Sequence, residues 1–235
     1  WSYLVNEDTH TITLMQYIGE TGLATIPGCV FQAQDITKET PYQIVINKKR
    51  LWNGTPLTKV VFRDITIGET TYTAKMEITR ESEKEKDPNL GLDTTNETDY
   101  RYLFKNCVHL EAVVNIPKDI TNATHLFDSC SSLVAGYDFE GYTNLVDCSY
   151  LYVGCRALID ASMTNLDSAD NLVSIEKMYC GCDNLEKSGD IVDCTQLSKC
   201  SNAFYGCKNL QTIPSFKDCP LITSLDNVFT GCINL

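Results

Sequence analysis

Hydrophobic and polar positions between residues 100 and 235 repeat with a period of about 25 residues. Six segments contain an aromatic residue, two variable residues, cysteine, two variable residues and leucine, and neighbouring cysteines are 23 to 27 residues apart. The six cysteines of this pattern are Cys107, Cys130, Cys155, Cys182, Cys207 and Cys232. Self-similarity at such a period predicts a repeat architecture, in which each unit packs on its neighbours.

Hydrophobic residues recur at −7, −4, −3 and 0 when each repeat cysteine is position 0, as in Ala123, Leu126, Phe127 and Cys130. This spacing predicts a short helix with one buried face. Asn, Asp or Ser stands at −8 in four of five units, and Gly stands at −1 in four of six. These residues suit the two ends of a helix, because the first type caps free N–H groups and glycine tolerates a left-handed conformation.

The residues after each cysteine predict a short strand. Leucine at +3, a small or aliphatic residue at +6 and often an apolar residue at +9 follow the cysteine, as in Leu110, Val113 and Ile116. Burial of about six side chains does not offset the ordering of about 25 residues, so the units must stack. We therefore expect an α/β solenoid with parallel strands on the concave face and short helices on the other.

The first hundred residues lack this regular pattern. At 11–14 threonine alternates with aliphatic residues, which predicts a β-hairpin within residues 1–30. Segments 42–48 and 57–72 are further strand candidates. We interpret residues 31–99 as degenerate early repeats, and a separate small β-domain is the alternative.

Residues 80–99 are charged and contain proline and glycine, which predicts an exposed loop before six regular repeats in residues 100–235. The sixth repeat is incomplete, because the sequence stops at Leu235 in mid-unit. Its bare apolar end predicts either that the protein continues or that this end packs on a second copy in an end-to-end homodimer. The start at Trp1, without methionine, indicates a processed or trimmed N-terminus.

Residues 203–214, with the sequence AFYGCKNLQTIP, resemble the unit of the BspA-like leucine-rich repeat family of bacterial and protozoan surface proteins. The resemblance covers residues 100–235, but residues 160–164 depart from the family pattern and only some units carry its proline, such as Pro117 and Pro214. It implies a leucine-rich repeat fold with an N-terminal hairpin cap. It also implies a secreted or cell-surface location and a role in adhesion or in recognition of a protein or glycan on another cell or matrix.

Net charge excludes one class of partner. The chain has 19 Lys and Arg against 31 Asp and Glu, a formal net charge of −12 at pH 7. An acidic surface repels phosphate backbones, so we expect no nucleic-acid partner. Hydrophobic residues make up 43% of the chain, as in folded proteins, and no apolar run approaches the roughly 18 residues of a membrane-spanning helix.

The twelve cysteines are explained by packing. Ten fall in repeat columns, where a small apolar side chain suits a buried turn, and we interpret the six at position 0 as a structural ladder. A mostly reduced protein is favoured, with a disulfide framework as the alternative. Cys180 and Cys182 lack a second pair or a partnering histidine, so we expect no zinc site and no other metal or cofactor.

No catalytic motif is recognisable in the sequence. The chain lacks P-loop, dinucleotide-binding, nucleophile-elbow and HExxH motifs. His109 and His125 lie near repeat cysteines but at variable positions, so we expect both to face solvent rather than to act as bases. We therefore expect no enzymatic activity, and a thiol- or metal-dependent enzyme is the remaining alternative of that class.

The candidate binding surface is the concave face of the predicted sheet, at positions +5 and +7. Its candidate residues are Ala112, Val114, Ala135, Tyr137, Asp160, Ser162, Lys187 and Thr212, with Gly189 and Pro214 also at +7. We expect adhesion or partner recognition through this face. The alternative function is a structural spacer or stalk within a larger surface or phage tail-fibre protein.

Overall fold

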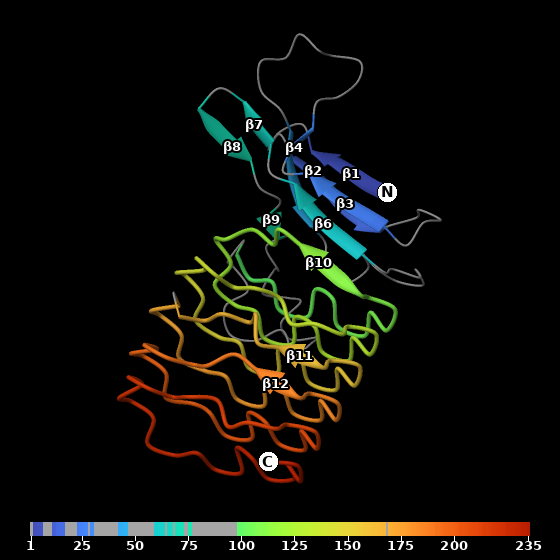
Figure 1. Ribbon diagram of the computed structural model, residues 1–235. Helices are drawn as coiled ribbons and strands as arrows, with labels where there is room; N and C mark the ends of the chain where they lie inside the picture. Colours follow the sequence, from blue (N-terminus) through green and yellow to red (C-terminus); the bar gives the residue numbers. More distant parts are fainter. Residues whose placement is uncertain are drawn as a thin grey trace, which may run out of the picture. The chain divides into compact units, whose positions relative to one another are not determined.

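The computed structural model describes residues 2–6, 11–16, 23–27, 29–30, 42–46, 59–63, 65–67, 69–72, 75–76, 98–167 and 169–235. The chain divides into two compact units. The first, here called the N-terminal unit, consists of Trp1–Asp99 with Val113–Pro117, and the second, the repeat unit, consists of Tyr100–Ala112 with Lys118–Leu235. Strands β1 to β9 lie in the N-terminal unit, and β11 and β12 lie in the repeat unit (Figure 1).

The N-terminal unit contains short β-strands. Strands β1 (Ser2–Asn6) and β2 (Thr11–Gln16) pair antiparallel, and β2 pairs parallel with β5 (Tyr42–Ile46). Strand β5 also pairs with β4 (Cys29–Val30) and β9 (Lys75–Met76). The other sheets are β10–β6–β3 and the hairpin β7–β8, with the bounds β3 Leu23–Pro27, β6 Lys59–Arg63, β7 Ile65–Ile67, β8 Thr70–Tyr72 and β10 Ala112–Val114.

Side chains alternate between buried and exposed along these strands. In β3, Ala24 and Ile26 are buried while Leu23 and Thr25 are exposed. This period of two is the one that a half-buried strand requires. The same alternation buries Ile12 and Leu14 in β2, and Val60 and Phe62 in β6.

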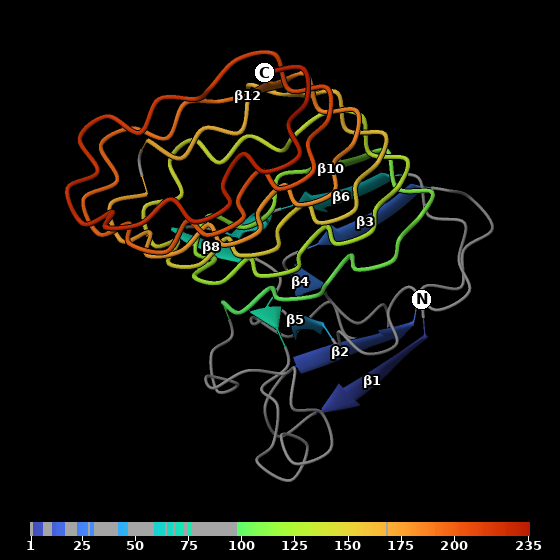
Figure 2. The same ribbon diagram turned by 90° about the horizontal axis from the view of Figure 1, so that it is seen from below.

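Four columns of peptide groups, hydrogen-bonded head to tail, join the repeats of the repeat unit. In the first four repeats the N–H groups at −7, −5, −3 and −1 donate to the carbonyl oxygens at −8, −6, −4 and −2 of the next repeat. The N–H of His125 donates to the carbonyl oxygen of Ser149 at 3.1 Å, and the N–H of Tyr150 donates to that of Glu176 at 2.8 Å. Because the Ser149 carbonyl and the Tyr150 N–H belong to one peptide group, the bonds continue from repeat to repeat. Figure 2 shows the stacked coils that these bonds join.

The predicted short helices are wrong, because the described residues contain no helix. The segment from −8 to 0 is a run of turns in which an N–H donates to the carbonyl three residues earlier, as Cys130 does to Phe127 at 3.1 Å. Positive φ at the third residue of a turn is type II geometry, and it ends the helical path. Residues at −5 and −1 have φ between 53° and 83° in all six repeats: Tyr102, His125, Tyr150, Lys177, Asn202 and Asn227 at −5, and Asn106, Ser129, Gly154, Gly181, Gly206 and Gly231 at −1.

The turns nevertheless bury the predicted positions. Ala123, Leu126, Phe127 and Cys130 are all buried, so the −7, −4, −3 and 0 pattern describes the core side of the repeat. The polar residue at −8 also acts as a side-chain acceptor, because Asn122 Oδ1 receives the N–H of Thr124 at 2.9 Å. Two consecutive turns therefore bury the same residues that one short helix would have buried.

The parallel sheet of the repeat unit consists of narrow ladders. Strands β11 (Asp160–Ala161) and β12 (Lys187–Ser188) pair parallel, with Asp160 opposite Lys187, and Ala135 forms a parallel bridge to Asp160. A second row of parallel bridges joins the −8 positions of four repeats: Asn122, Asp147, Ser174 and Lys199. The predicted parallel pairing is therefore present, but over one or two residues in each repeat.

Two side-chain ladders fill the core of the repeat unit. The rings at −3 stack with centroids 5.0 to 5.6 Å apart, in the order Phe104, Phe127, Tyr152, Tyr179, Phe204 and Phe229. Beside them, each position-0 thiol from Cys130 onward donates to the carbonyl oxygen of the aromatic residue one repeat earlier, at 3.0 to 3.1 Å. Of the six, Cys130, Cys155, Cys182 and Cys207 are buried, and Cys107 and Cys232 are half-buried.

The buried and exposed positions after the cysteine differ from the prediction in the fifth repeat. Ile213 at +6 is 64% exposed, although its position predicts an inward side chain, and Pro214 at +7 is buried, although it was expected on the outer face. Residues 211–216 form no strand, and both Thr212 and Ile213 are exposed, so the alternation of a strand does not apply here. Both expectations are therefore wrong for this repeat, while Val113 and Ile116 of the first repeat are buried as predicted.

Candidate functional site

The predicted concave-face residues do not form one continuous row. Ala112 and Val114 lie in β10, which pairs with β6, and both are half-buried. The other six, all in the repeat unit, are here called the β face, although Ala112 belongs to that unit as well: Ala135, Tyr137, Asp160, Ser162, Lys187 and Thr212. All of these except Tyr137 are exposed.

A register-matched charge pair lies at the centre of the β face. Asp160 and Lys187 are opposite each other in β11 and β12, and Ala135 precedes them in the same row. The Ser162 N–H donates to Asp160 Oδ1 at 2.8 Å. Hydrogen bonding from Ser162 and the positive charge of Lys187 lower the pKa of Asp160, so the carboxylate is ionised at neutral pH.

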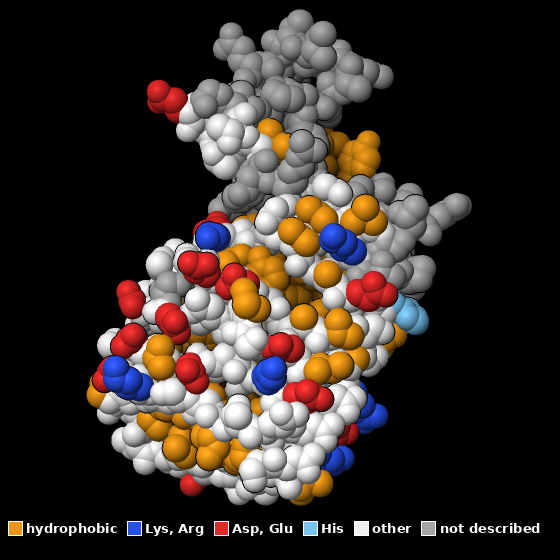
Figure 3. Space-filling model, in the orientation of Figure 1, with side chains coloured by type: hydrophobic (Ala, Val, Ile, Leu, Met, Phe, Trp, Pro, Cys, Tyr) orange, Lys and Arg blue, Asp and Glu red, His pale blue; other side chains and the backbone are white. Residues whose placement is uncertain are grey.

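Apolar side chains that the sequence reasoning missed flank this pair. Val134 and Ile159, at +4 of adjacent repeats, are 52% and 46% exposed, and the Ile159 N–H donates to the Val134 carbonyl at 3.0 Å. Figure 3 shows apolar, acidic and basic side chains mixed on the face that carries β11 and β12. The β face therefore combines a small apolar patch with one pair of opposite charges.

Tyr137 is held by packing rather than presented to solvent. Its hydroxyl lies 2.7 Å from the Tyr142 hydroxyl, and its N–H donates to Tyr152 Oη at 2.7 Å. Its ring also packs at an angle against Phe139 with centroids 5.0 Å apart. As a half-buried member of this aromatic cluster, it is less able to contact a ligand than its +7 position indicates.

A second surface runs along position −5 on the turn side of the repeats and is here called the His125 strip. It comprises Tyr102, Lys105, His125, Tyr150 and Lys177, four of which are at −5 of successive repeats. The His125 ring stacks on Tyr102 at 4.9 Å and on Tyr150 at 4.4 Å between centroids. Lys105 Nζ lies over the Tyr102 ring at 5.4 Å and Lys177 Nζ over the Tyr150 ring at 5.0 Å.

The structure corrects the expectation for His125. Its side chain is 18% exposed and lies between two tyrosine rings, so it does not face solvent freely. His109, in contrast, is exposed as expected. The −5 column of Tyr, His, Tyr and Lys is visible once the repeats are aligned, and it is the sequence signal for this strip.

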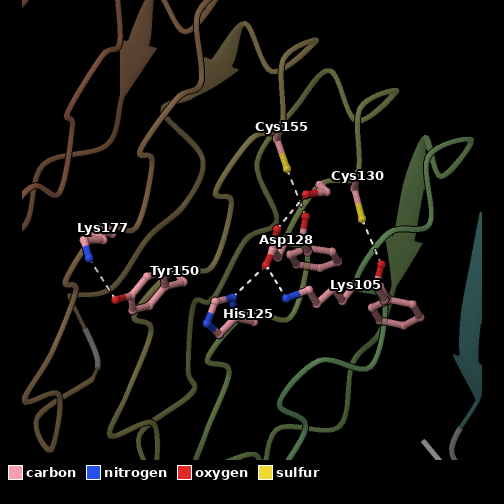
Figure 4. A network of polar contacts seen from close by, with 10 residues as sticks. Lys105, His125, Asp128, Cys130, Tyr150, Cys155 and Lys177 are labelled. Atoms are coloured by element: carbon pink, nitrogen blue, oxygen red, sulfur yellow. Dashed lines mark hydrogen bonds and ion pairs between the residues drawn. The ribbon is translucent and has the colours of Figure 1, made fainter. Parts of the chain in front are cut away.

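The buried carboxylate of Asp128 holds His125 and Lys105 of the strip in place. Its carboxylate is 8% exposed and lies 2.7 Å from His125 Nδ1, 3.0 Å from Lys105 Nζ and 2.7 Å from Ser129 Oγ (Figure 4). Burial raises the pKa of Asp128, but hydrogen bonds from His125, Ser129 and Lys105 and the charge of Lys105 outweigh it and lower the pKa to about 2. The carboxylate is therefore ionised at neutral pH, and its contact with Nδ1 orients the imidazole of His125.

The thiols of the repeat unit are poor nucleophiles. The eleven cysteines from Cys107 to Cys232 are free thiols, and burial raises the pKa of Cys107 and of Cys155 to about 12. A nucleophilic cysteine requires the thiolate, which such pKa values disfavour. Among the described residues no group of three or more His, Cys, Asp or Glu side chains is placed to hold a metal ion, and no helix is long and apolar enough to cross a membrane.

No protein-family model and no curated protein matches the chain. Solved structures that match it include a leucine-rich cell-surface protein of Faecalibacterium prausnitzii, with 18% identity over 92% of this chain and 52% of that protein, at a TM-score of 0.43. Leucine-rich repeat proteins of Bacteroides ovatus and T. pallidum match with 13% and 16% identity, over 100% and 89% of this chain and 73% and 87% of theirs, at TM-scores of 0.42 and 0.27. The chain thus spans about half the length of the Faecalibacterium protein.

Proposed function

We propose that this chain is part of a secreted or cell-surface leucine-rich repeat protein, without enzymatic activity, that recognises a partner through the β face. The observation that carries the proposal is the parallel register of Asp160 and Lys187 beside exposed Ala135. Parallel pairing places side chains of successive repeats about 4.8 Å apart in one row. Such a row offers a partner several contacts on a rigid support.

The chemistry of the β face favours a protein or glycan partner on another cell or matrix. Val134 and Ile159 supply apolar area, while Asp160 and Lys187 supply charges that fix the orientation of a partner. Protein interfaces combine an apolar centre with such polar groups at the rim. The high thiol pKa values of Cys107 and Cys155 support the absence of cysteine catalysis.

A structural spacer remains the second candidate, and a specific observation favours it. The aromatic ladder is continuous from Phe104 to Phe229, and asparagine side chains form another chain, in which Asn234 Nδ2 donates to Asn209 Oδ1 at 3.1 Å. Continuous ladders of this kind stiffen a stack of repeats along its length. A rod of stacked repeats with no partner would have the same core.

An interface variant distinguishes the two candidates. The wild-type chain and the double variant Asp160→Ala/Lys187→Ala are screened on an array of extracellular proteins and glycans. We expect at least one ligand of the wild type to bind the variant about tenfold more weakly, because two oriented charges are lost. Lys208→Ala is the control, since Lys208 pairs with Asp183 at 3.2 Å outside the β face. If every ligand is retained by the double variant, the β face is not a recognition surface and the spacer role stands.

A further inference from the structure

We propose that the His125 strip is a second binding site and that its ligand is a polysaccharide containing uronic acids. The strip crosses the first four repeats, and none of its five residues belongs to the β face. The proposal therefore stands or falls separately from the proposed function of the β face. It is carried by the arrangement of ring faces, hydrogen-bond donors and acidic groups along the strip.

The ring faces of the strip are already occupied. His125 stacks on Tyr102 at 4.9 Å and on Tyr150 at 4.4 Å between centroids, and the Lys177 ammonium group lies 5.0 Å from the Tyr150 centroid, at the hydroxyl end of that ring. An aromatic face must be open to stack on the apolar face of a neutral sugar. The strip presents ring edges instead, with their polar atoms, and so selects for a ligand that binds through charge and hydrogen bonds.

Donor groups are available at the surface of the strip. Lys177 Nζ donates to Tyr150 Oη at 3.1 Å (Figure 4), which leaves the Tyr150 hydroxyl proton without a protein acceptor among the described residues. The closest carboxylate oxygen to Lys177, on Glu176, is 3.8 Å away, which is too long for a hydrogen bond. His125 Nδ1 is engaged by Asp128, and its Nε2 has no protein partner in the described part of the chain. The Lys177 ammonium group and the Tyr150 hydroxyl therefore point to a ligand that accepts hydrogen bonds and carries negative charge.

The acidic groups nearby discriminate between anionic ligands. Asp128 is buried and already accepts from three donors, so it does not face a ligand. Glu176 is 37% exposed beside Lys177 and remains an acceptor that needs a donor. A uronic acid residue supplies both counterparts on one ring, since its carboxylate suits Lys177 and its hydroxyls suit Glu176. An acidic peptide brings carboxylates without neighbouring hydroxyls, so its side chains offer Glu176 no hydroxyl donor.

Binding to immobilised polymers of known composition tests the proposal. The full chain is passed over polygalacturonate, neutral dextran and poly-L-glutamate at low and at physiological salt. We expect binding to polygalacturonate that weakens as salt rises, because the contacting charges are at the surface. We expect no binding to dextran and clearly weaker binding to poly-L-glutamate. Failure to bind polygalacturonate, or equal binding to either of the other polymers, would overturn the proposal.

Matched variants locate the site. Lys177→Gln keeps a hydrogen-bond donor but removes the charge, and we expect about tenfold weaker binding to polygalacturonate, whereas Lys177→Arg should bind like the wild type. Lys208→Gln, at an exposed lysine outside both the strip and the β face, is the control for nonspecific charge and should change nothing. Thermal unfolding confirms that each variant is folded, as expected for half-buried and exposed positions. Wild-type affinity in Lys177→Gln, or an equal loss in Lys208→Gln, would overturn the assignment of the site to the strip.

Discussion

Replacing Asp128 by asparagine removes a buried negative charge that His125, Lys105 and Ser129 hold in place. In the folded chain the pKa of Asp128 is lowered from 3.8 to about 2, because these partners outweigh the cost of burial. A pKa that is lower by nearly two in the folded state corresponds to about 2 kcal/mol of unfolding free energy. The side chain is 8% exposed, so solvent screens this contribution little.

The sign of the effect sets a pH window. A carboxyl group with a lowered folded-state pKa stabilises the fold fully above its unfolded-state pKa, and this stabilisation is lost as the pH falls through the folded-state value. Wild-type Asp128 should therefore contribute about 2 kcal/mol at pH 7 and almost nothing at pH 2. In Asp128→Asn the same contribution is absent at every pH.

Urea unfolding of both proteins at pH 7, 5, 3 and 2, followed by circular dichroism, measures the difference. The gap between wild type and Asp128→Asn should narrow by about 2 kcal/mol between pH 5 and pH 2, and the other carboxyl groups cancel because both proteins share them. Gln196→Ala, which removes an exposed uncharged side chain, is the control and should show no such convergence. If both proteins lose equal stability over this range, the reasoning about the Asp128 cluster is refuted.

Three further predictions concern the core ladders. Cys182→Ala should lower the unfolding free energy by about 2 kcal/mol, because it removes a buried thiol and its hydrogen bond to the Tyr152 carbonyl. Urea unfolding should show a smaller loss for Cys232→Ala, since Cys232 is half-buried. Equal losses in the two variants would contradict the role of burial. Gly206→Ala should lower the unfolding free energy by about 1 kcal/mol, because a φ of 74° is strained for any residue with a Cβ. Thermal unfolding measures this, with Lys208→Ala at an exposed position as the control. An unchanged melting temperature would argue against the turn geometry. A thiol reagent should modify the native chain slowly and about 12 thiols after denaturation without reductant, since the sequence has 12 cysteines; near-zero denatured thiols would mean that disulfides, not free thiols, occupy the repeat columns.

The repeats and their buried positions were predictable because burial depends on spacing alone. Ala123, Leu126, Phe127 and Cys130 face the core whether the backbone is helical or a run of turns. The backbone type was not predictable from the same spacing. Glycine marks the left-handed residue at −1, and we interpreted it as the end of a helix. At −5 the left-handed residues include Tyr102 and Lys177, whose types do not indicate a positive φ.

The candidate surfaces were predictable to different degrees. The row of Asp160 and Lys187 follows directly from counting along the repeat, because parallel register repeats with the unit. The half-buried state of Tyr137 depends on Tyr142 and Phe139, which lie outside the regular pattern. The stacking of His125 between tyrosines requires both the alignment of repeats at −5 and the turn geometry that projects these side chains side by side. The alignment of these residues at −5 was readable in the sequence, whereas the turn geometry was not.

The four columns of aligned peptide groups give the repeat unit a net dipole along the stack. Each peptide group carries a dipole of about 3.5 D, and within a column every N–H points toward the higher-numbered repeat. In an ordinary sheet strand dipoles largely cancel, but here they add from repeat to repeat, as they do along a helix. Along a column this dipole favours cations toward the lower-numbered repeats and anions toward the higher-numbered ones, and Lys105 in the first repeat and Asp226 in the turn of the sixth follow that order. If the repeats were reordered, the charged residues would have to keep their order along the stack, and every repeat would have to keep its chain direction, for the charges to match this dipole.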